Sequence, residues 1–158
     1  MGFSPSGFVS ARFLFFLTVT MVLAALITVL MLGLVNVKDP VLLFGGFLMI
    51  GAIYGTFGAI VGLLSTDIMV AILCIVLLAN LDAGWLQNPV FYSSAQQTDI
   101  IRWLPAFYPT QTIFAAAFTS SSNYWAFLMG GIYSAVLLTS LLGIIHLKIR
   151  NVKKWWNA

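Results

Sequence analysis

Few side chains in this sequence could take part in chemistry, and those that could lie in or beside long apolar segments. Asn80 and Asp82 are the only polar pair within a stretch that is otherwise apolar. An ionisable group at membrane depth is typical of a functional site, so this pair predicts part of a substrate pathway or gate. The alternative places Asp82 in the outer headgroup region, just beyond the end of a membrane span.

Other candidate residues have simpler explanations. His146 stands next to a basic cluster, where a role as an interfacial anchor is more common than one in a proton relay. Asp99 and Arg102 are three residues apart, a spacing that gives a local exposed ion pair of small energy on a helix. Cys74 is single and lies in an apolar run, so one chain can build neither a disulfide nor a cysteine metal site.

The sequence contains no motif for hydrolysis or metal binding. The patterns GxxxxGK[ST], HExxH and GxSxG are absent, and the chain has 1 histidine. We therefore predict no catalytic residue, no metal site and no cofactor, and we expect that the chain is not an enzyme. Any ATP hydrolysis would belong to a partner.

Composition indicates a membrane protein. The chain has 158 residues, of which 61% are hydrophobic and 7% charged, and this leaves too little polar surface for a soluble domain. The formal net charge is +3, but four of the 7 Lys and Arg residues lie at 148–154, directly after an apolar segment. That position favours membrane lipids over nucleic acid as the partner.

We predict an all-α integral membrane protein with a single domain over residues 1–158. Four transmembrane helices cover about 13–35, 41–64, 67–86 and 124–147, each near the ~20 residues that cross a bilayer. The uninterrupted apolar part of the third is only 68–81, which taken alone also fits a buried or interfacial helix. Four spans put Arg12 and the basic tail on one side, so the positive-inside rule predicts that both termini are cytoplasmic.

Residues 97–120 are predicted to form an external re-entrant helical hairpin between the third and fourth spans. Pro105 and Pro109 interrupt any continuous helix, which gives two short helices that meet near Tyr108. Neither half is long enough to cross a bilayer. We predict a gate over a cavity between the spans, made by Trp103, Pro105, Tyr108 and Pro109.

Two GxxxG pairs in the second span predict close helix packing. They follow helical spacing along one side and consist of Gly51, Gly55, Gly58 and Gly62. The helix that packs against them lies either within this chain or in another chain. At the end of the sequence, residues 148–158 form a predicted cytoplasmic tail whose membrane-interface anchors are Lys148, Arg150, Lys153, Lys154, Trp155 and Trp156.

The order of these segments resembles the C-terminal part of ABC-2 type transporter permeases. A short apolar span, an external segment with a WLPxxxP turn at 103–109, and a final span with a basic tail carry the likeness. The resemblance implies that the chain corresponds to spans three to six of the usual six. One departure is that the family's first two spans, and most of its cytoplasmic coupling helix, have no counterpart before Arg12.

The resemblance also implies a function and partners. The chain would be a permease subunit or half-permease, in the cell membrane of a bacterium or archaeon, that moves a lipid, drug or peptide-like substrate. It would act with a separate ATP-binding subunit and with further permease chains. The alternative is a small structural or assembly subunit of a multi-subunit membrane complex.

Overall fold

The computed structural model describes residues 5–87, 100–119 and 123–156, with side chains described for 11, 14–82, 84, 101–119 and 123–148. These residues form helices and contain no strand, in agreement with the predicted all-α class. In chain order the helices are α1 (Pro5–Leu34), α2 (Pro40–Leu64), α3 (Ile68–Gln87), the 3-10 turn η1 (Ile100–Trp103), α5 (Phe107–Phe118) and α6 (Tyr124–Trp156).

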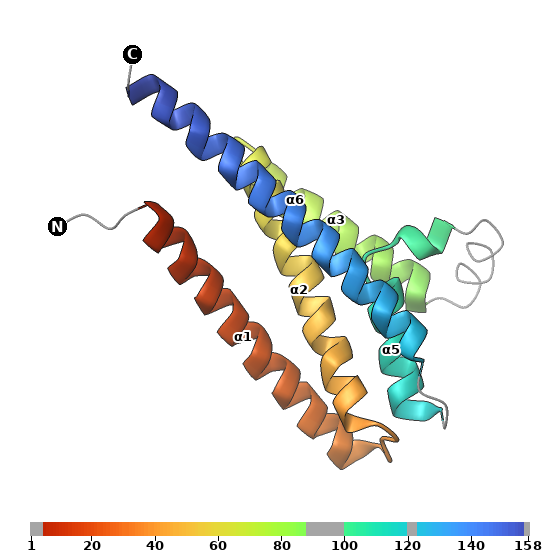
Figure 1. Ribbon diagram of the computed structural model, residues 1–158. Coiled ribbons are helices and arrows are strands. Elements are labelled where there is room, and N and C mark those ends of the chain that lie inside the picture. The colour runs from red at the N-terminus through yellow and green to blue at the C-terminus, as the bar shows by residue number, and fades with distance from the viewer. Residues whose placement is uncertain (1–4, 88–99, 120–122, 157–158) are drawn as a thin grey trace.

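Helix α2 is the centre of the bundle, because it packs against α1, α3, α5 and α6. Figure 1 shows that the N-terminal end of α1 and the C-terminal end of α6 lie at the same end of the molecule. The connection from α1 to α2, the C-terminal end of α5 and the start of α6 lie at the opposite end. Short α5 fills the space beside the first part of α2, and it contacts both α2 and α6.

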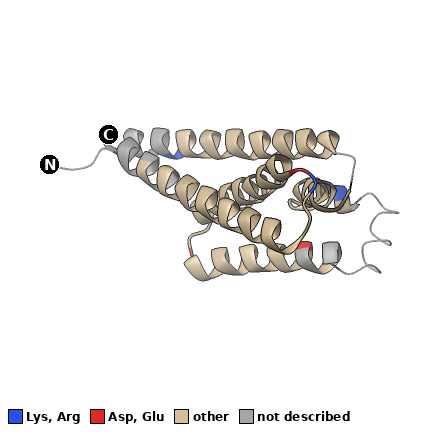
Figure 2. Ribbon diagram, turned by 90° about the horizontal axis from the view of Figure 1, so that it is seen from below, with Lys and Arg blue, Asp and Glu red and all other residues tan. Residues whose placement is uncertain are grey.

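Three helices are long and apolar enough to cross a membrane: Leu14–Leu34, Pro40–Leu64 and Tyr124–Lys148. They correspond to the predicted spans 13–35, 41–64 and 124–147. Between 11% and 17% of the most apolar part of each is buried within the chain, so most of their side chains face outward. Figure 2 shows these helices free of charge over nearly their whole length. Lipid or partner chains must cover such apolar surfaces, so the protein belongs in a membrane.

Helix α3 has a shorter apolar part than the three spans. It continues through Asn80 and Asp82 to Gln87, but the apolar part with described side chains, Ile68–Asp82, is shorter than the three spans. Its start is set by Asp67, whose Oδ1 accepts the Met69 N–H at 2.8 Å. Such a side-chain cap satisfies one of the N–H groups that a helix leaves unpaired in its first turn.

The other helix starts follow the same chemistry. Pro40 occupies the first turn of α2, where its missing N–H is no loss, and Asp39 Oδ1 accepts the Leu42 N–H at 3.0 Å. Asn123 precedes α6, and its Oδ1 accepts the Ala126 N–H at 3.1 Å. Polar residues at these sites therefore define where the apolar helices begin.

The segment between α3 and α6 differs from the predicted hairpin of two helices. In its described part, 100–119, a 3-10 turn, η1, precedes α5, and the bend falls at 104–106 rather than near Tyr108. Pro109 lies inside the first turn of α5, where backbone N–H groups make no hydrogen bond within the helix. The N–H that proline lacks is therefore not needed there, and Pro109 does not break the helix. The first α5 bond beyond it runs from the Thr110 N–H to the Ala106 carbonyl at 2.9 Å.

Small residues allow α5 to approach α2 closely. Ala115, Ala116 and Ala117 are buried, and the last two pack in a cluster with Leu42 and Leu43 of α2. The Ala116 carbonyl accepts the N–H groups of Lys38 and Asp39 at 3.1 and 3.0 Å. A carbonyl in the last turn of a helix has no partner within the helix, so these bonds tie the end of α5 to the α1–α2 connection.

Candidate functional site

A buried carboxylate on α3 is the most unusual polar feature of the described residues. Asp82 is only 2% exposed, and its Oδ2 accepts a hydrogen bond from the Tyr54 hydroxyl of α2. Its Oδ1 has no hydrogen-bond partner in the part of the chain that the structure describes. Burial of a carboxylate among apolar helices is unfavourable unless its oxygens are paired, so this arrangement needs an explanation beyond packing.

Two further elements lie near this carboxylate. The backbone of Ala106, in the bend before α5, lies near it. Tyr133 of α6 is half-buried and close enough to interact electrostatically with Asp82. Asp82 therefore joins α3 to α2 and lies near α6 and the bend at 104–106. We name Tyr54, Asp82, Ala106 and Tyr133 the carboxylate junction.

The carboxylate junction lies beside the middle of α2, one of the three helices long and apolar enough to cross a membrane. Tyr54 is near the middle of α2, roughly 20 Å from its start and 15 Å from its end at a helical rise of ~1.5 Å per residue. Because Asp82 bonds directly to Tyr54, it too lies well within the span formed by α2. This position favours the interpretation of Asp82 as a residue within a span over its interpretation as a residue of the outer headgroup region.

Asn80, predicted to share a site with Asp82, points elsewhere. It is exposed, and its side-chain amide donates to the Val76 carbonyl of its own helix at 2.9 Å. Two residues along a helix differ by about 200° in direction, so Asn80 and Asp82 cannot face the same neighbour. The structure therefore separates this predicted pair.

The predicted gate residues differ in how far they are buried. Pro105 and Pro109 are buried, and Pro109 is among the most completely buried side chains. Tyr108 is half-buried and forms an edge-on ring contact with Phe107 at 5.1 Å between centroids. Trp103 is 79% exposed, as suits a ring at the membrane interface rather than a gate. Arg102 beside it is exposed, whereas its predicted partner Asp99 lies outside the described residues.

The four predicted glycines face different neighbours instead of one groove. A Cβ at Gly51 or Gly55 would collide with α1, at Thr20 or Phe16 respectively. A Cβ at Gly58 would lie in ordinary contact with Ile75 of α3, at 3.5 Å. A Cβ at Gly62 would meet no described atom within 4 Å.

Other close approaches involve residues that the sequence analysis did not select. A Cβ at Gly46 would lie 2.6 Å from Ile113 of α5, and one at Gly45 would lie 2.8 Å from Phe127 of α6. A Cβ at Gly130 of α6 would collide with Met49 of α2. None of these glycines forms a GxxxG pair with Gly51, Gly55, Gly58 or Gly62. The only sequence signal for them was the presence of glycine in an apolar helix.

Of the predicted interface anchors, only Lys148 has a described side chain. It is exposed, and its Nζ donates to the Leu63 carbonyl at the C-terminal end of α2. A cation there favourably meets the negative end of the helix dipole. The backbone of α6 continues through Arg150, Lys153 and Lys154 to Trp156.

The residues with described side chains contain no group of three or more His, Cys, Asp and Glu that could hold a metal ion. Cys74 and His146 are exposed on different helices. The chemistry that the carboxylate junction can offer is therefore that of one carboxylate and two phenols: hydrogen bonding, and binding of a proton or cationic group.

No protein family, curated protein or solved structure matches this chain. The carboxylate junction and the bend that covers it are therefore the features from which a function can be argued.

Proposed function

We propose that this chain is a permease subunit, or half-permease, of an ABC transporter that moves a lipid, drug or peptide-like substrate. The observation that carries the proposal is the burial of Asp82 beside Tyr54 of α2, near the bend that leads into α5, the helix that packs against both α2 and α6. A spacer subunit would not need a carboxylate in such a place. Intramembrane ionisable residues that face a bundle interior are typical of transport pathways and gates.

In this proposal the bend at 104–106 is the movable part of the gate. Its backbone has few internal bonds: the Leu104 N–H donates to the Ile101 carbonyl and the Phe107 N–H to the Leu104 carbonyl, both at 3.1 Å. Non-helical backbone at membrane depth needs protein or water to satisfy its polar groups. The Asp82 carboxylate lies near the Ala106 backbone, and we expect a change at Asp82 to alter the position of the bend.

The energy for transport would come from a separate ATP-binding subunit, and further permease chains would complete the pathway. The outward-facing apolar surface of the three spans supports the need for such neighbours. Helix α3 serves as a fourth, shorter span in this arrangement, and residues 100–118 enter one leaflet as a re-entrant segment. Both termini then lie in the cytoplasm of a bacterial or archaeal cell.

The topology can be tested with an impermeant thiol reagent. In a Cys74→Ser background, single cysteines at Gln96→Cys and Asn157→Cys should label from opposite sides of the membrane. Labelling of both from the same side would contradict the fourth span.

The gate can be tested by comparing complex yield with activity. Pro105→Ala combined with Pro109→Ala removes both restrictions and favours a continuous helix across the bend, which would displace it from Asp82. We expect the affinity-purified complex to form at normal yield but to lose transport and stimulation of its ATPase. Pro40→Ala, at the exposed start of α2, is the matched control.

Normal activity at normal yield of the double variant would rule out the gate and would favour a structural or assembly subunit. A purified complex that contains no ATP-binding subunit would contradict the transporter itself.

A further inference from the structure

One face of α3 points away from the rest of the bundle. Helix α3 packs mainly against α2, and the buried side chains of Ala71 and Asp82 mark its packed face. On the other side of the helix the side chains are exposed and apolar, apart from one asparagine. We name as the outer face of α3 the residues Met69, Leu73, Val76 and Asn80.

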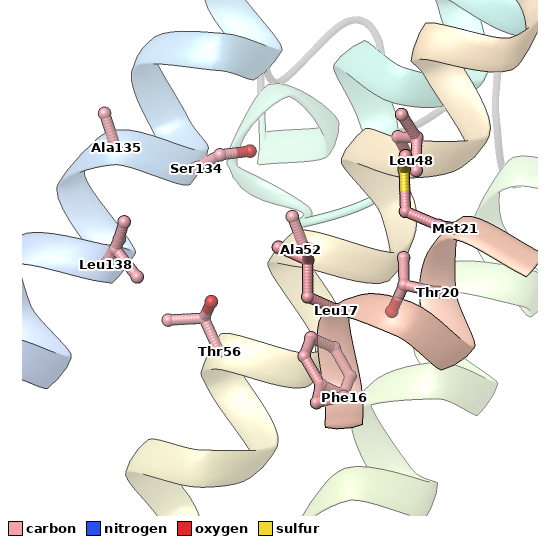
Figure 3. Close-up of a pocket in the computed structure, with 10 residues that line it drawn as sticks. All are labelled: Phe16, Leu17, Thr20, Met21, Leu48, Ala52, Thr56, Ser134, Ala135 and Leu138. Carbon is pink, nitrogen blue, oxygen red and sulfur yellow. The ribbon is translucent and has the colours of Figure 1, made fainter. Parts of the chain in front are cut away.

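The Asn80 carboxamide is only partly satisfied within its own helix. One N–H donates to the Val76 carbonyl at 2.9 Å, while the second N–H and the side-chain oxygen make no hydrogen bond in the described part of the chain. Hydroxyl groups on other spans differ, because their one donor is used: Thr18 of α1 donates to its own helix, and so does Ser134, which faces the apolar crevice between α1 and α6 in Figure 3. A carboxamide has two donors and an acceptor, so a single backbone carbonyl does not satisfy it.

The position of Asn80 along the bundle excludes water as the natural partner of this amide. Asn80 precedes Asp82 by two residues, or ~3 Å along the helix axis, and Asp82 bonds to Tyr54 near the middle of α2. Helix α2 is long and apolar enough to cross a membrane. Hydrocarbon chains beside it offer neither a donor nor an acceptor, so an outward amide at this height is stabilised by a polar group of another helix.

The chemistry and spacing of the outer face fit a second copy of the same face. A carboxamide both donates and accepts, so two Asn80 side chains related by a twofold axis can bond to each other reciprocally. Positions 69, 73, 76 and 80 are separated by four, three and four residues, the heptad spacing of a helix seam, and lie within about 40° of the direction of Asn80. A single asparagine in such a seam fixes the register of two identical helices. None of the four residues is charged, so two copies do not repel each other there.

We propose that the outer face of α3 binds the same face of a second copy of this chain, with Asn80 of each copy hydrogen-bonded to Asn80 of the other. Two copies inserted with the same topology place their α3 helices parallel, and Met69, Leu73 and Val76 pack on either side of the seam. Gly84, one turn after Asn80, has no side chain to hold the two helices apart. This contact requires α3 to lie in the membrane beside α2, but it requires neither transport nor an ATP-binding subunit.

Oxidative cross-linking tests which face of α3 meets the second copy. The full chain is reconstituted alone in phospholipid vesicles, with copper phenanthroline as the oxidant. Leu73→Cys in a Cys74→Ser background places a thiol in the seam, and we expect it to form a disulfide-linked dimer. The unsubstituted chain is the matched control, because Cys74 is exposed on the same helix but points about 100° away. Cross-linking through Cys74 that equals or exceeds that through Leu73→Cys would overturn the proposal.

Substitution of Asn80 tests the hydrogen bond across the seam. Association is measured by energy transfer between copies labelled at Asn157→Cys in the Cys74→Ser background, as the vesicles are diluted with lipid. Asn80→Leu removes the amide but keeps the size of the side chain, and we expect the dissociation constant to rise about tenfold. Asn80→Gln keeps the amide and should weaken association less, while Thr139→Val, at an exposed threonine of α6, should leave it unchanged. Unchanged or tighter association of Asn80→Leu would overturn the proposal.

A measurement on the unsubstituted chain guards against variants that fold poorly. The chain, expressed alone and extracted in a mild detergent, should have twice the mass of one 17.3 kDa copy by native mass spectrometry. A single copy at every protein concentration would overturn the proposal, because lipid or a different subunit would then cover the outer face. That result would leave the proposed transporter intact, since its own test is the presence of an ATP-binding subunit in the purified complex.

Discussion

The two halves of α2 have similar sequences but different surroundings. In the first half Leu42, Leu43, Gly46 and Met49 are buried, because α5 lies against α2 and closes the space toward α6. In the second half, beyond Thr56, Gly62 and Leu64 are exposed and no helix like α5 fills the gap. The carboxylate junction lies where the two halves meet.

This difference teaches that a short inserted helix adds a tight contact that the glycine pattern does not mark. The GxxxG pair Gly51 and Gly55 lies close against α1, whereas the close approach of α5 is at Gly46, outside the GxxxG pairs. The loosely packed half is free to meet lipid or partner chains. The tightly packed half holds the bend in place above Asp82.

The largest expected effect comes from leucine at glycine positions in the two halves. Gly46→Leu would force a side chain into Ile113, and overpacking of this kind destabilises by about 1–3 kcal/mol. Gly62→Leu meets open space and should change stability by less than about 0.5 kcal/mol. Thermal unfolding of both variants in the same detergent measures the difference. Equal tolerance would mean that α5 does not pack on α2 as described.

A smaller effect is expected at the carboxylate junction. Tyr54→Phe keeps the ring but removes the hydroxyl that donates to Asp82, which leaves a buried oxygen unpaired at a cost of about 2 kcal/mol. Tyr124→Phe, at an exposed tyrosine, should be neutral. In a double-mutant cycle with Asp82→Asn, the two effects should be non-additive if the residues interact. Additive effects would show that Tyr54 and Asp82 are independent.

The smallest effects are expected when the N-terminal caps of α2 and α3 are removed. Asp39→Ala removes the cap of α2 beside the α5 contact and should destabilise by about 1 kcal/mol. Asp67→Ala removes the exposed cap of α3 and should cost only about 0.5 kcal/mol. Unfolding midpoints in detergent again provide the measurement. A larger loss of stability in Asp67→Ala than in Asp39→Ala would contradict this prediction.

Much of the fold could be predicted because it depends on local properties of the chain. Long apolar runs and polar caps such as Asp39 and Asn123 set where the membrane helices begin. The bend was less predictable, since the effect of a proline depends on its place in a helix. Pro109 fits into the first turn of α5, so the break falls instead at 104–106.

The site could be predicted only in part. Asp82 was recognisable as an ionisable residue in an apolar run, but its partners come from α2, α6 and the bend, which are distant in sequence. Tyr54 and Tyr133 resemble ordinary membrane tyrosines until the tertiary structure brings them to one carboxylate. Asn80 was chosen for its polarity, although helical geometry already turns it away from Asp82.

The central claim is that Asp82 controls the bend for transport, and Asp82→Asn tests it most directly. The amide keeps the size of the side chain and an oxygen that can accept from Tyr54, so the complex should assemble at normal yield. The measurement is ATPase activity and transport by the purified complex in vesicles, with Asn80→Gln as the exposed control. We predict a loss of at least about tenfold, corresponding to ~1.4 kcal/mol in the barrier. Unchanged activity at unchanged yield would contradict the claim.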